Sequence, residues 1–430
     1  MDAKRPLLTA RAYLRSRSWL GARFGLRAMK ALVRELGHPE KAFKSLLIAG
    51  TNGKGSVSAY LDVALRASGL KAGRYTSPHL IDIRERITVS GRNIGTADFE
   101  RLVLQVRECA ERLLERGVLT AHPNHFEILT LVAFLHFREC GVDVAVLEVG
   151  LGGRLDATNV SSPLVSSIVS IDFDHEEYLG RTLGAIAGEK AGVLRRGRVA
   201  VLGPMARDAD RTIEAAARTK GARIDRAFAG VTVRNGREGL DIRTPHGLYK
   251  NVRPLPGAHQ RTNLVVAIRS LEAFADAGVP VGLARAIPAM STAVWPGRLE
   301  TFPGRPGFLL DGAHNPAGAR ALARYLAESK TGDVLVFGAM RDKHIAEMAA
   351  EIFPKFRKII ATRVRMTRAA TTSQIADLGK DLGVPVVEEA SIRAALIRAQ
   401  SLAGPGGTVV VAGSLYLVGA VRRLLLAKRG

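Results

Sequence analysis

A glycine-rich segment with one lysine is the first feature of this sequence whose residue types could do chemistry. GTNGKGS follows a short apolar run and comprises Gly50, Thr51, Asn52, Gly53, Lys54, Gly55 and Ser56. Glycines let successive backbone N–H groups turn toward a phosphate, and the N-terminus of a following helix adds its dipole. Lys54 could then reach the β- and γ-phosphates of a nucleotide, and the Ser56 hydroxyl could touch Mg²⁺ or phosphate.

The segment departs from the usual phosphate-loop pattern, GxxxxGK[ST]. Ile48 stands at the first glycine position, and Gly55 separates the lysine from the hydroxyl. The alternative interpretation is a glycine-rich turn with a surface lysine. A strand-like run before the segment and a helix-period run after it favour the phosphate loop. A GTPase would also need an NKxD base-recognition motif, which the sequence lacks.

Acidic and histidine side chains follow two later apolar runs of the chain. Glu148 lies near the end of the first run, within EVGLGGRLDATN, and Asp172, Asp174 and His175 directly follow the second. Open α/β sheets bind ligands at the carboxyl ends of their strands, and a buried carboxylate there needs a partner such as a divalent cation. Because Mg²⁺ prefers oxygen ligands near phosphate, these residues indicate a magnesium site.

Both strand ends have structural alternatives. Glu148 could be salt-bridged in a tight turn, and His175 could be a hydrogen-bonded structural residue. GLGGR also resembles a dinucleotide fingerprint, but Leu155 stands where GxGxxG has its third glycine, and no clear helix pattern opens there. The sequence contains neither HExxH nor the ligand spacing of a zinc site.

Length and composition limit the class of protein to which the chain can belong. The chain has 430 residues, which at about 150 per domain predicts two or three domains. With 47% hydrophobic and 24% charged residues it is neither disordered, collagen-like nor coiled-coil. The longest apolar run, residues 409–421, is shorter than the roughly 18 residues of a membrane span. Two cysteines, Cys109 and Cys140, and the lack of a secretory apolar core in the first forty residues favour the cytoplasm.

Basic residues exceed acidic ones by 63 to 40, a formal net charge of +23. Such a charge favours anionic partners, whether nucleic acid, anionic lipid or a polyanionic metabolite. A nucleic-acid-binding face usually shows clustered basic residues. Here they are spread along the chain, and aromatic residues amount to 5%. We therefore expect no nucleic-acid partner; a general surface excess of arginine is the alternative explanation of the charge.

Strand-like and helix-like runs alternate along the chain, which predicts an α/β fold. We expect an N-terminal parallel-sheet domain, residues 1–295, that contains the phosphate loop, and a smaller Rossmann-like α/β domain, residues 296–430. A proline-rich stretch beginning at Trp295-Pro296-Gly297 marks the border. The residue pattern over 232–252 is typical of hairpins at an edge. Further expected elements are helices over 10–36, 57–68 and 260–275 and strands over 45–49, 144–149, 165–171, 308–310, 334–337, 358–362 and 408–412.

The motifs together resemble the folylpolyglutamate synthase/dihydrofolate synthase family, within the Mur-ligase-like ATP-dependent amide ligases. The similar segments run in order along nearly the whole chain: FGLRAMKALVRELGHPEKAFKSLLIAGTNGKGS, YTSPHLIDIRERI, NHFEILTLVAFLHF, EVGLGGRLDATN, DHEEYLGRTLGAIAGEKAGVL, PGAHQRTNLVVAI, WPGRLE, LDGAHNP and VVAGSLYLVG. Related cell-wall ligases usually carry GTNGKT, so GTNGKGS with TSPHL favours the folate branch.

The resemblance implies roles that spacing alone does not give. The loop of residues 50–56 would hold the ATP phosphates, with Lys54 on the transferring γ-phosphoryl group. Ser77, Glu148 and His175 would hold Mg²⁺. Lys190 matches the family's carbamylated lysine, which helps to bind a second metal. The further ATP-contacting positions would be Asn263, Arg298 and Asp311.

Two further roles follow from the same resemblance. His314 would lie near the glutamate or the nucleotide and would join Lys54 and Lys190 as a catalytic residue. The pterin-bearing substrate would contact Arg84, Arg86, Asn124 and Phe126. Without the resemblance, several of these residues have ordinary structural interpretations: Ser77 a turn residue, Lys190 a solvated helix lysine, Asn263 a hydrogen-bonding residue of a helix, Arg298 a linker residue and Asp311 a turn residue.

The sequence therefore predicts a ligase that uses ATP and Mg²⁺ to join L-glutamate to dihydropteroate, to a reduced folate or to both, through an acyl phosphate. We expect a cytoplasmic monomer with no membrane partner. One alternative is a Mur-type ligase of cell-wall precursors. The alternative from another class is a P-loop NTPase that acts on nucleic acid.

Overall fold

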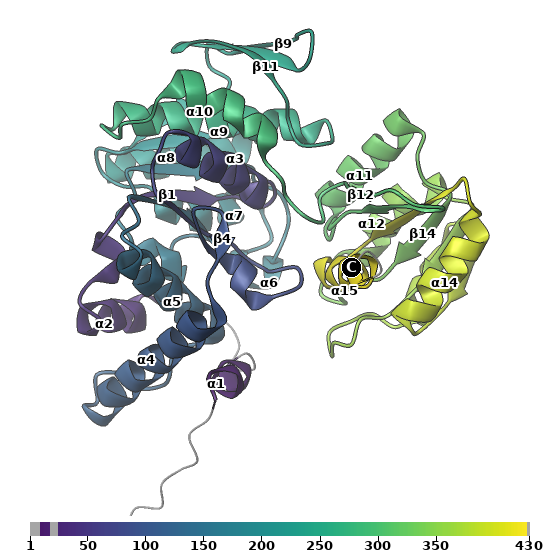
Figure 1. Cartoon of the computed structure of the whole chain (residues 1–430), viewed down its shortest axis with the longest axis horizontal. Helices are drawn as coiled ribbons and strands as arrows, with labels where there is room; N and C mark the ends of the chain where they lie inside the picture. The colour runs from purple at the N-terminus through teal and green to yellow at the C-terminus, as the bar shows by residue number, and fades with distance from the viewer. Residues whose placement is uncertain (1–8, 18–24, 428–430) are drawn as a thin grey trace, which may run out of the picture. The chain divides into compact units, whose positions relative to one another are not determined.

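A computed structural model describes residues 9–17 and 25–427, which divide into two compact units (Figure 1). The N-terminal unit comprises Met1–His79, Arg84–Pro254 and Thr262–Ala293, and the C-terminal unit comprises Leu80–Ile83, Leu255–Arg261 and Val294–Gly430. The helical stretch predicted over residues 10–36 gives α1 (Ala10–Arg17) and α2 (Arg27–Glu35). Residues 18–24, in the middle of that prediction, lie outside the described residues.

The N-terminal unit is built on an eight-stranded sheet, with the order β4-β3-β2-β5-β1-β6-β7-β8 among the described residues. The sequence of β1 (Lys44–Ala49), KSLLIA, is buried from its second residue onward, as expected for a central strand of a parallel sheet. β1 pairs in parallel with β5 (Val144–Glu148) and β6 (Val165–Ile168), placing Ile48 opposite Glu148. The carboxyl ends of the three strands therefore share one edge of the sheet.

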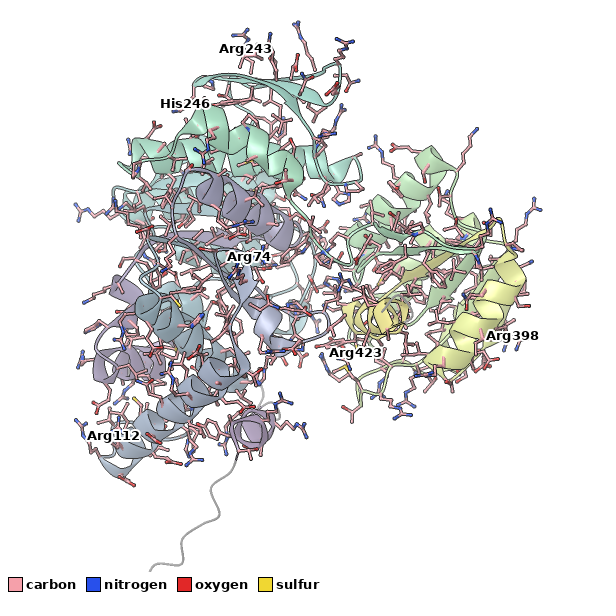
Figure 2. All side chains as sticks on the ribbon, viewed as in Figure 1. Arg74, Arg112, Arg243, His246, Arg398 and Arg423 are labelled. Atoms are coloured by element: carbon pink, nitrogen blue, oxygen red, sulfur yellow. The ribbon has the colours of Figure 1, made fainter. Side chains whose placement is uncertain are left out.

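Helices cover both faces of this sheet. Arg74 of β2 lies 3.6 Å from the Asp62 carboxylate of α3, measured from Nη1 to Oδ2. A Cβ on the preceding residue, Gly73, would instead lie 3.0 Å from the Phe137 ring of α5. Because successive strand residues point to opposite faces, α3 and α5 pack on opposite sides of the sheet. Arg74 is labelled in Figure 2. Burial lowers the pKa of its guanidinium, and the Asp62 carboxylate opposes this shift.

The remaining elements of the N-terminal unit surround this core. The other strands of the large sheet are β2 (Ala72–Tyr75), β3 (Ile87–Val89), β4 (Arg92–Asn93), β7 (Val199–Leu202) and β8 (Arg223–Arg226). The helices are α3 (Lys54–Ala67), α4 (Thr96–Glu115), α5 (His125–Glu139), α6 (Glu176–Leu179), α7 (Leu183–Lys190), α8 (Arg207–Lys220), α9 (His259–Asp276) and α10 (Leu283–Ala289). The first residues of α9, up to Arg261, belong to the C-terminal unit.

The hairpins predicted over residues 232–252 form a separate antiparallel sheet of β9 (Thr232–Asn235), β10 (Leu240–Thr244) and β11 (Gly247–Val252). The inward residues of β10, Leu240, Ile242 and Thr244, are buried. Arg243 alternates with them, is exposed, and is labelled on this sheet in Figure 2. The sheet thus has one buried and one exposed face, as alternating residues predict.

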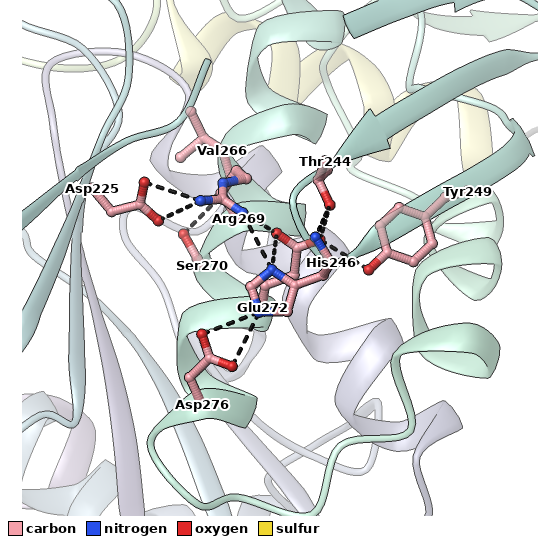
Figure 3. A network of polar contacts seen from close by, with 9 residues as sticks. All are labelled: Asp225, Thr244, His246, Tyr249, Val266, Arg269, Ser270, Glu272 and Asp276. Atoms are coloured by element: carbon pink, nitrogen blue, oxygen red, sulfur yellow. Dashed lines mark hydrogen bonds and ion pairs between the residues drawn. The ribbon is translucent and has the colours of Figure 1, made fainter. Parts of the chain in front are cut away.

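A buried polar network fixes the small sheet to α9 (Figure 3). The Arg269 guanidinium donates to both oxygens of Asp225 on β8, at 3.0 and 2.8 Å, and also to Glu272. The fully buried Glu272 carboxylate accepts from Thr244 Oγ1 at 2.5 Å and Tyr249 Oη at 2.9 Å. One arginine therefore compensates two carboxylates, and the network as a whole connects four elements, β8, β10, β11 and α9.

The C-terminal unit has a six-stranded sheet of order β12-β13-β17-β14-β15-β16. Of its strands, β12 alone runs antiparallel to its neighbour among the described residues. Helices α11, α12 and α13 pack on one face, and α14 and α15 on the other. The bounds are β12 (Glu300–Phe302), β13 (Gly307–Leu310), β14 (Val334–Phe337), β15 (Lys358–Ala361), β16 (Val386–Glu388), β17 (Thr408–Ala412), α11 (Pro316–Ser329), α12 (Ile345–Ile352), α13 (Thr372–Asp381), α14 (Ile392–Ala403) and α15 (Leu415–Ala427).

A short segment from early in the chain belongs to this second unit. The Ile81 carbonyl accepts a 2.8 Å hydrogen bond from Arg423 Nη2 on α15. A Cβ at Gly419, one turn earlier on α15, would clash with the Leu80 carbonyl oxygen. Leu80 also packs against the core of the unit. Residues 80–83 are thus held by the last helix of the chain.

The predicted α/β class is confirmed, with a parallel-sheet N-terminal domain and a smaller α/β C-terminal domain. β14 and β17 have the predicted bounds, whereas β6 ends at Ile168, three residues before the predicted end of that strand, where the backbone leaves the ladder. Within the described part of the chain, none of the helices is long and apolar enough to cross a membrane.

The network at α9 makes a stability prediction. Replacing Arg269 by Met leaves Asp225 and the buried Glu272 without their cation, so we expect a loss of about 3 kcal/mol in the free energy of unfolding. Arg116→Met breaks an exposed ion pair with Glu35 and should cost less than about 1 kcal/mol. Urea unfolding of the two variants measures the difference, and equal losses would contradict the role of the network.

Candidate functional site

The first four residues of the glycine-rich segment, Gly50 to Gly53, form a loop between β1 and α3, and Lys54 to Ser56 begin α3. The Thr51 backbone N–H donates to the Ser170 carbonyl at 2.9 Å, and the Asn52 N–H donates to Ser170 Oγ at 3.0 Å. Gly53 precedes the helix with a φ of 84°, and a Cβ there would clash with Asn263 Oδ1. Only glycine fits this position, because it tolerates positive φ and leaves room for Asn263.

Two lysines meet at one carbonyl of this loop. Lys54 Nζ donates to the Gly50 carbonyl at 2.8 Å and to the Thr51 carbonyl at 3.1 Å, and Lys190 Nζ donates to the Gly50 carbonyl at 3.1 Å. Lys190 is 5% exposed, so it is not a solvated helix lysine. Burial, and then repulsion by Lys54, lower the pKa of Lys190 to about 7. An anion at this loop would meet two closely spaced amines.

The ends of β2 and β5 bring together two of the predicted metal ligands. The Ser77 backbone N–H donates to Glu148 Oε2 at 3.3 Å, and Glu148 is 4% exposed. A buried carboxylate next to a phosphate loop fits Mg²⁺, which is commonly bound through one or two carboxylates, water and substrate phosphates. Among the described residues, His, Cys, Asp and Glu side chains do not gather in groups of three or more that could hold a metal. Glu148 beside the phosphate loop thus fits a cation that is held jointly with phosphate oxygens.

His175 lies just beyond β6, at the start of α6. Its backbone adopts a positive φ of 53°, its N–H donates to Asp174 Oδ1 at 2.9 Å, and its Nε2 lies 3.8 Å from the same oxygen. Asp174 is buried, whereas the His175 side chain is 40% exposed. The imidazole is thus accessible and has a carboxylate beside it.

The residues predicted to face the pterin lie at the start of α5 and in the segment before β3. Asn124 caps α5: its Oδ1 accepts from the Glu127 N–H at 2.9 Å, and Glu127 Oε2 accepts from the Asn124 N–H at 2.8 Å. Phe126 packs 5.8 Å from the Tyr75 ring, centroid to centroid. Arg84 Nη1 donates to Thr96 Oγ1 at 2.7 Å, and Arg86 Nε donates to His79 Nδ1 at 3.0 Å, with His79 just before residues 80–83.

The C-terminal unit gathers its predicted residues after β13. Asp311 is buried and accepts from the backbone N–H groups of Leu299 and Ala313, each at 2.9 Å. Burial raises the pKa of Asp311, and the Arg298 guanidinium lowers it. His314 Nδ1 lies 2.8 Å from the Gly312 carbonyl, and the next residue, Asn315, caps α11 through Oδ1.

One group near these residues was not predicted. His259, at the start of α9, feels the charges of Asp311 and Arg298, and burial lowers its pKa. It stands in the PGAHQRTN motif, but 52 positions before Asp311, and no local spacing connects the two. Only the tertiary fold of the C-terminal unit brings the three together.

Together, the loop at the end of a parallel strand and the acidic group beside it define an α/β phosphate-binding enzyme. Residues 297–415 match the family "Mur ligase, glutamate ligase domain". The chain is 33% identical over 437 residues to the dihydrofolate synthase/folylpolyglutamate synthase of Bacillus subtilis, covering 96% of this chain and 99% of that protein. It is 34% identical to a probable bifunctional folylpolyglutamate synthase/dihydropteroate synthase of Haloferax volcanii, of which it spans 48%.

Comparison with solved structures indicates the same family. The Mycobacterium tuberculosis folylpolyglutamate synthase complexed with ADP superposes with a TM-score of 0.89 at 32% identity, covering 96% of each chain. A bifunctional folylpolyglutamate synthase/dihydrofolate synthase with Mn, AMPPNP and L-glutamate bound gives 0.86 at 30% identity, covering 97% of this chain and 98% of that one. The chain belongs to the folylpolyglutamate synthase/dihydrofolate synthase family, as its motifs predicted.

The buried amine of Lys190 makes stability depend on pH. Between its pKa of about 7 in the folded chain and its ordinary 10.5, the unfolded chain holds a proton that the folded chain has released. Stability therefore rises with pH across this window and is lowest below it. We expect Lys190→Met to raise the melting temperature at about pH 6, with the gain shrinking toward about pH 9. Thermal unfolding of both proteins in CO₂-free buffers tests this, and a gain independent of pH would contradict it.

Proposed function

We propose that this protein is an ATP-dependent ligase that joins L-glutamate to dihydropteroate, to a reduced folate or to both. The observation that carries the proposal is the pair of lysines at Gly50, in the phosphate loop of a chain of this family. A relative of known structure holds Mn, AMPPNP and L-glutamate, that is, a divalent metal, an analogue of ATP and the amino acid of such a reaction.

The loop and its lysines account for the first chemical step. A carboxylate is a poor electrophile toward an amine, so the acceptor carboxylate attacks the γ-phosphorus of ATP and forms an acyl phosphate, releasing ADP. Lys54 would leave the Gly50 and Thr51 carbonyls and neutralise charge on the transferring phosphoryl group. The amine of glutamate then attacks the acyl carbon, and inorganic phosphate leaves as the amide forms.

Ser77, Glu148 and His175 would hold Mg²⁺ together with the phosphate oxygens. When bound, the cation neutralises the phosphate oxygens and orients them for transfer. Lys190 reaches this role only after its neutral amine adds CO₂, because a carbamate offers two anionic oxygens where an ammonium repels a cation. Its burial favours the neutral amine that this addition needs. A second metal site is proposed at the Lys190 carbamate.

The other site residues receive roles by position. Asn263, packed on Gly53, and Arg298 with Asp311 in the C-terminal unit would contact ATP, and His314 would lie near the incoming glutamate or the nucleotide. Phe126, Arg84 and Arg86 would contact the pterin-bearing acceptor. Asn124 serves this site by capping α5, because its Oδ1 already accepts from Glu127.

We further propose that the enzyme works in the cytoplasm as a monomer. Cys109 and Cys140 are both free, which fits a reducing compartment. Light scattering of the purified protein tests the oligomeric state. Fractionation of its native cells tests the location.

The reaction itself is tested by ADP release. The wild-type protein should form ADP only when Mg²⁺, L-glutamate and a pterin acceptor are all present, and a comparison of dihydropteroate with tetrahydrofolate assigns one or both activities. Lys54→Met should lower the rate by about 10³-fold or more, since it removes charge stabilisation of the transition state, while the fold is kept. ATP turnover that nucleic acid stimulates without glutamate would instead favour a nucleic-acid-dependent NTPase.

The carbamate at Lys190 has its own test. Lys190→Arg keeps a cation but cannot form the carbamate, so it should be about as inactive as Lys190→Ala. Wild-type activity should fall when CO₂ and bicarbonate are stripped and recover when bicarbonate returns. An active arginine variant, or a wild type indifferent to CO₂, would show that Lys190 acts as an ordinary buried amine.

A further inference from the structure

The GLGGRLDATN motif forms a closed loop immediately after Glu148. The buried Asp156 carboxylate accepts hydrogen bonds from the backbone N–H groups of Gly150, Leu151 and Thr158, each at 3.0 Å. The Gly150 and Leu151 N–H groups lie in the segment that resembles a dinucleotide loop, and here they donate to a side chain of the same loop and not to phosphate. The motif therefore does not form a second anion site.

The middle of this loop packs on the end of α7, where Lys190 lies. The Arg154 backbone N–H donates to the Glu189 carbonyl at 2.8 Å. A Cβ at Gly153 would lie 3.0 Å from the carbonyl oxygens of both Glu189 and Lys190. This glycine allows a close approach between the loop and the helix end, because any larger residue would push the Lys190 backbone away.

Asn159 joins the two segments through one side chain. Its Nδ2 donates to the Arg154 carbonyl at 3.0 Å and to the Gly192 carbonyl at 3.3 Å, and its Oδ1 accepts from Arg195 Nη2 at 2.6 Å. Asn159 is 8% exposed, so these bonds form away from solvent. The same amide thus holds the loop after Glu148 and the turn after Lys190.

Two cations complete the attachment at the short 3₁₀ helix η4 (Ala191–Val193). Arg195 donates to the Asn159 carbonyl at 2.8 Å and to the Gly192 and Val193 carbonyls, each at 3.2 Å. Lys220 Nζ, at the end of α8, donates to the Ala191 and Gly192 carbonyls at 3.0 Å. Carbonyls at a helix C-terminus carry negative partial charge, so cations there are stabilising.

We propose that Asn159 and Arg195 are positioning residues that fix the spacing between Glu148 and Lys190. The loop leaves β5 directly after Glu148 and is bonded, through these two side chains, to the residues directly after Lys190. This rests on the proposed metal-binding roles of Glu148 and Lys190. Neither Asn159 nor Arg195 touches substrate or metal; each acts on the backbone that carries a ligand.

Metal affinity separates positioning from simple stability. Mn²⁺ is titrated into the protein mixed with an equal concentration of AMPPNP in bicarbonate buffer, and free Mn²⁺ is read by electron paramagnetic resonance, with AMPPNP alone as the blank. Asn159→Ala and Arg195→Gln should raise the Kd about 10–100-fold, as loss of residues that orient metal ligands does elsewhere. Arg195→Lys, which keeps the charge, should recover part of the affinity. Glu148→Gln, which removes the negative charge of a proposed ligand, shows the loss expected from a change at a ligand itself.

The matched control is Arg154→Gln. It lies on the same loop and removes an exposed ion pair with Glu189, whose arginine is 57% exposed, without touching the bonds of Asn159. Its Kd should stay within about threefold of the wild type, since exposed pairs contribute little. If Asn159→Ala does not fold, Asn159→Asp keeps the acceptor of Arg195 and removes both amide donations.

Lower melting temperatures with an unchanged Mn²⁺ Kd in the Asn159 and Arg195 variants would overturn the proposal, because the two residues would then be structural only. Absence of Mn²⁺ binding in the wild type would overturn it together with the metal roles. Glutamate-dependent ADP formation by the wild type is measured separately. It decides the proposed ligase activity whatever the metal titrations give.

Discussion

The parallel pairing of β1 between β5 and β6 is the constraint on which the N-terminal site depends. Because Ile48 is opposite Glu148 and Ala49 is opposite Ile168, the three strands end at the same level of the sheet. The pairing of the strands therefore places the phosphate loop, the buried Glu148 carboxylate and the residues after β6 next to one another. A register shift of one residue would turn Glu148 to the other face of the sheet.

Two lysine amines lie close together at this end of the sheet. A buried ammonium is costly unless it is paired, and Lys190 has only a carbonyl partner among its described hydrogen bonds, with Lys54 close by. The Gly50 carbonyl accepts a hydrogen bond from each amine but cannot cancel their charges. Such an arrangement is stabilised by a ligand of opposite charge, which fits a loop that binds phosphate.

The sequence predicted the strands β1, β5, β6, β13, β14, β15 and β17, because buried parallel strands are continuous apolar runs, but it did not predict β2, β7, β8 or β16. It also located the phosphate loop, whose glycines and lysine are adjacent in the chain. It could not show that Lys190 is buried, since neighbours distant in sequence decide this. That Asn124 caps α5 was missed although Glu127, three residues later, completes a capping-box pattern in the sequence. The compensation of Glu272 by Arg269 depends on β8, β10 and β11 meeting α9, which no local pattern encodes.

The chain passes between the two units at residues 79/80, 83/84, 254/255, 261/262 and 293/294. The C-terminal unit is therefore not a linear segment, although the matched glutamate ligase domain at residues 297–415 is one. A protein fragment that begins at residue 294 would lack residues 80–83. The surface of α15 around Gly419 and Arg423, which this segment covers, would then be exposed. An exchange of the C-terminal domain between relatives would have to include residues 80–83. Otherwise the segment at 80–83 and the surface of α15 would have to be redesigned to fit each other.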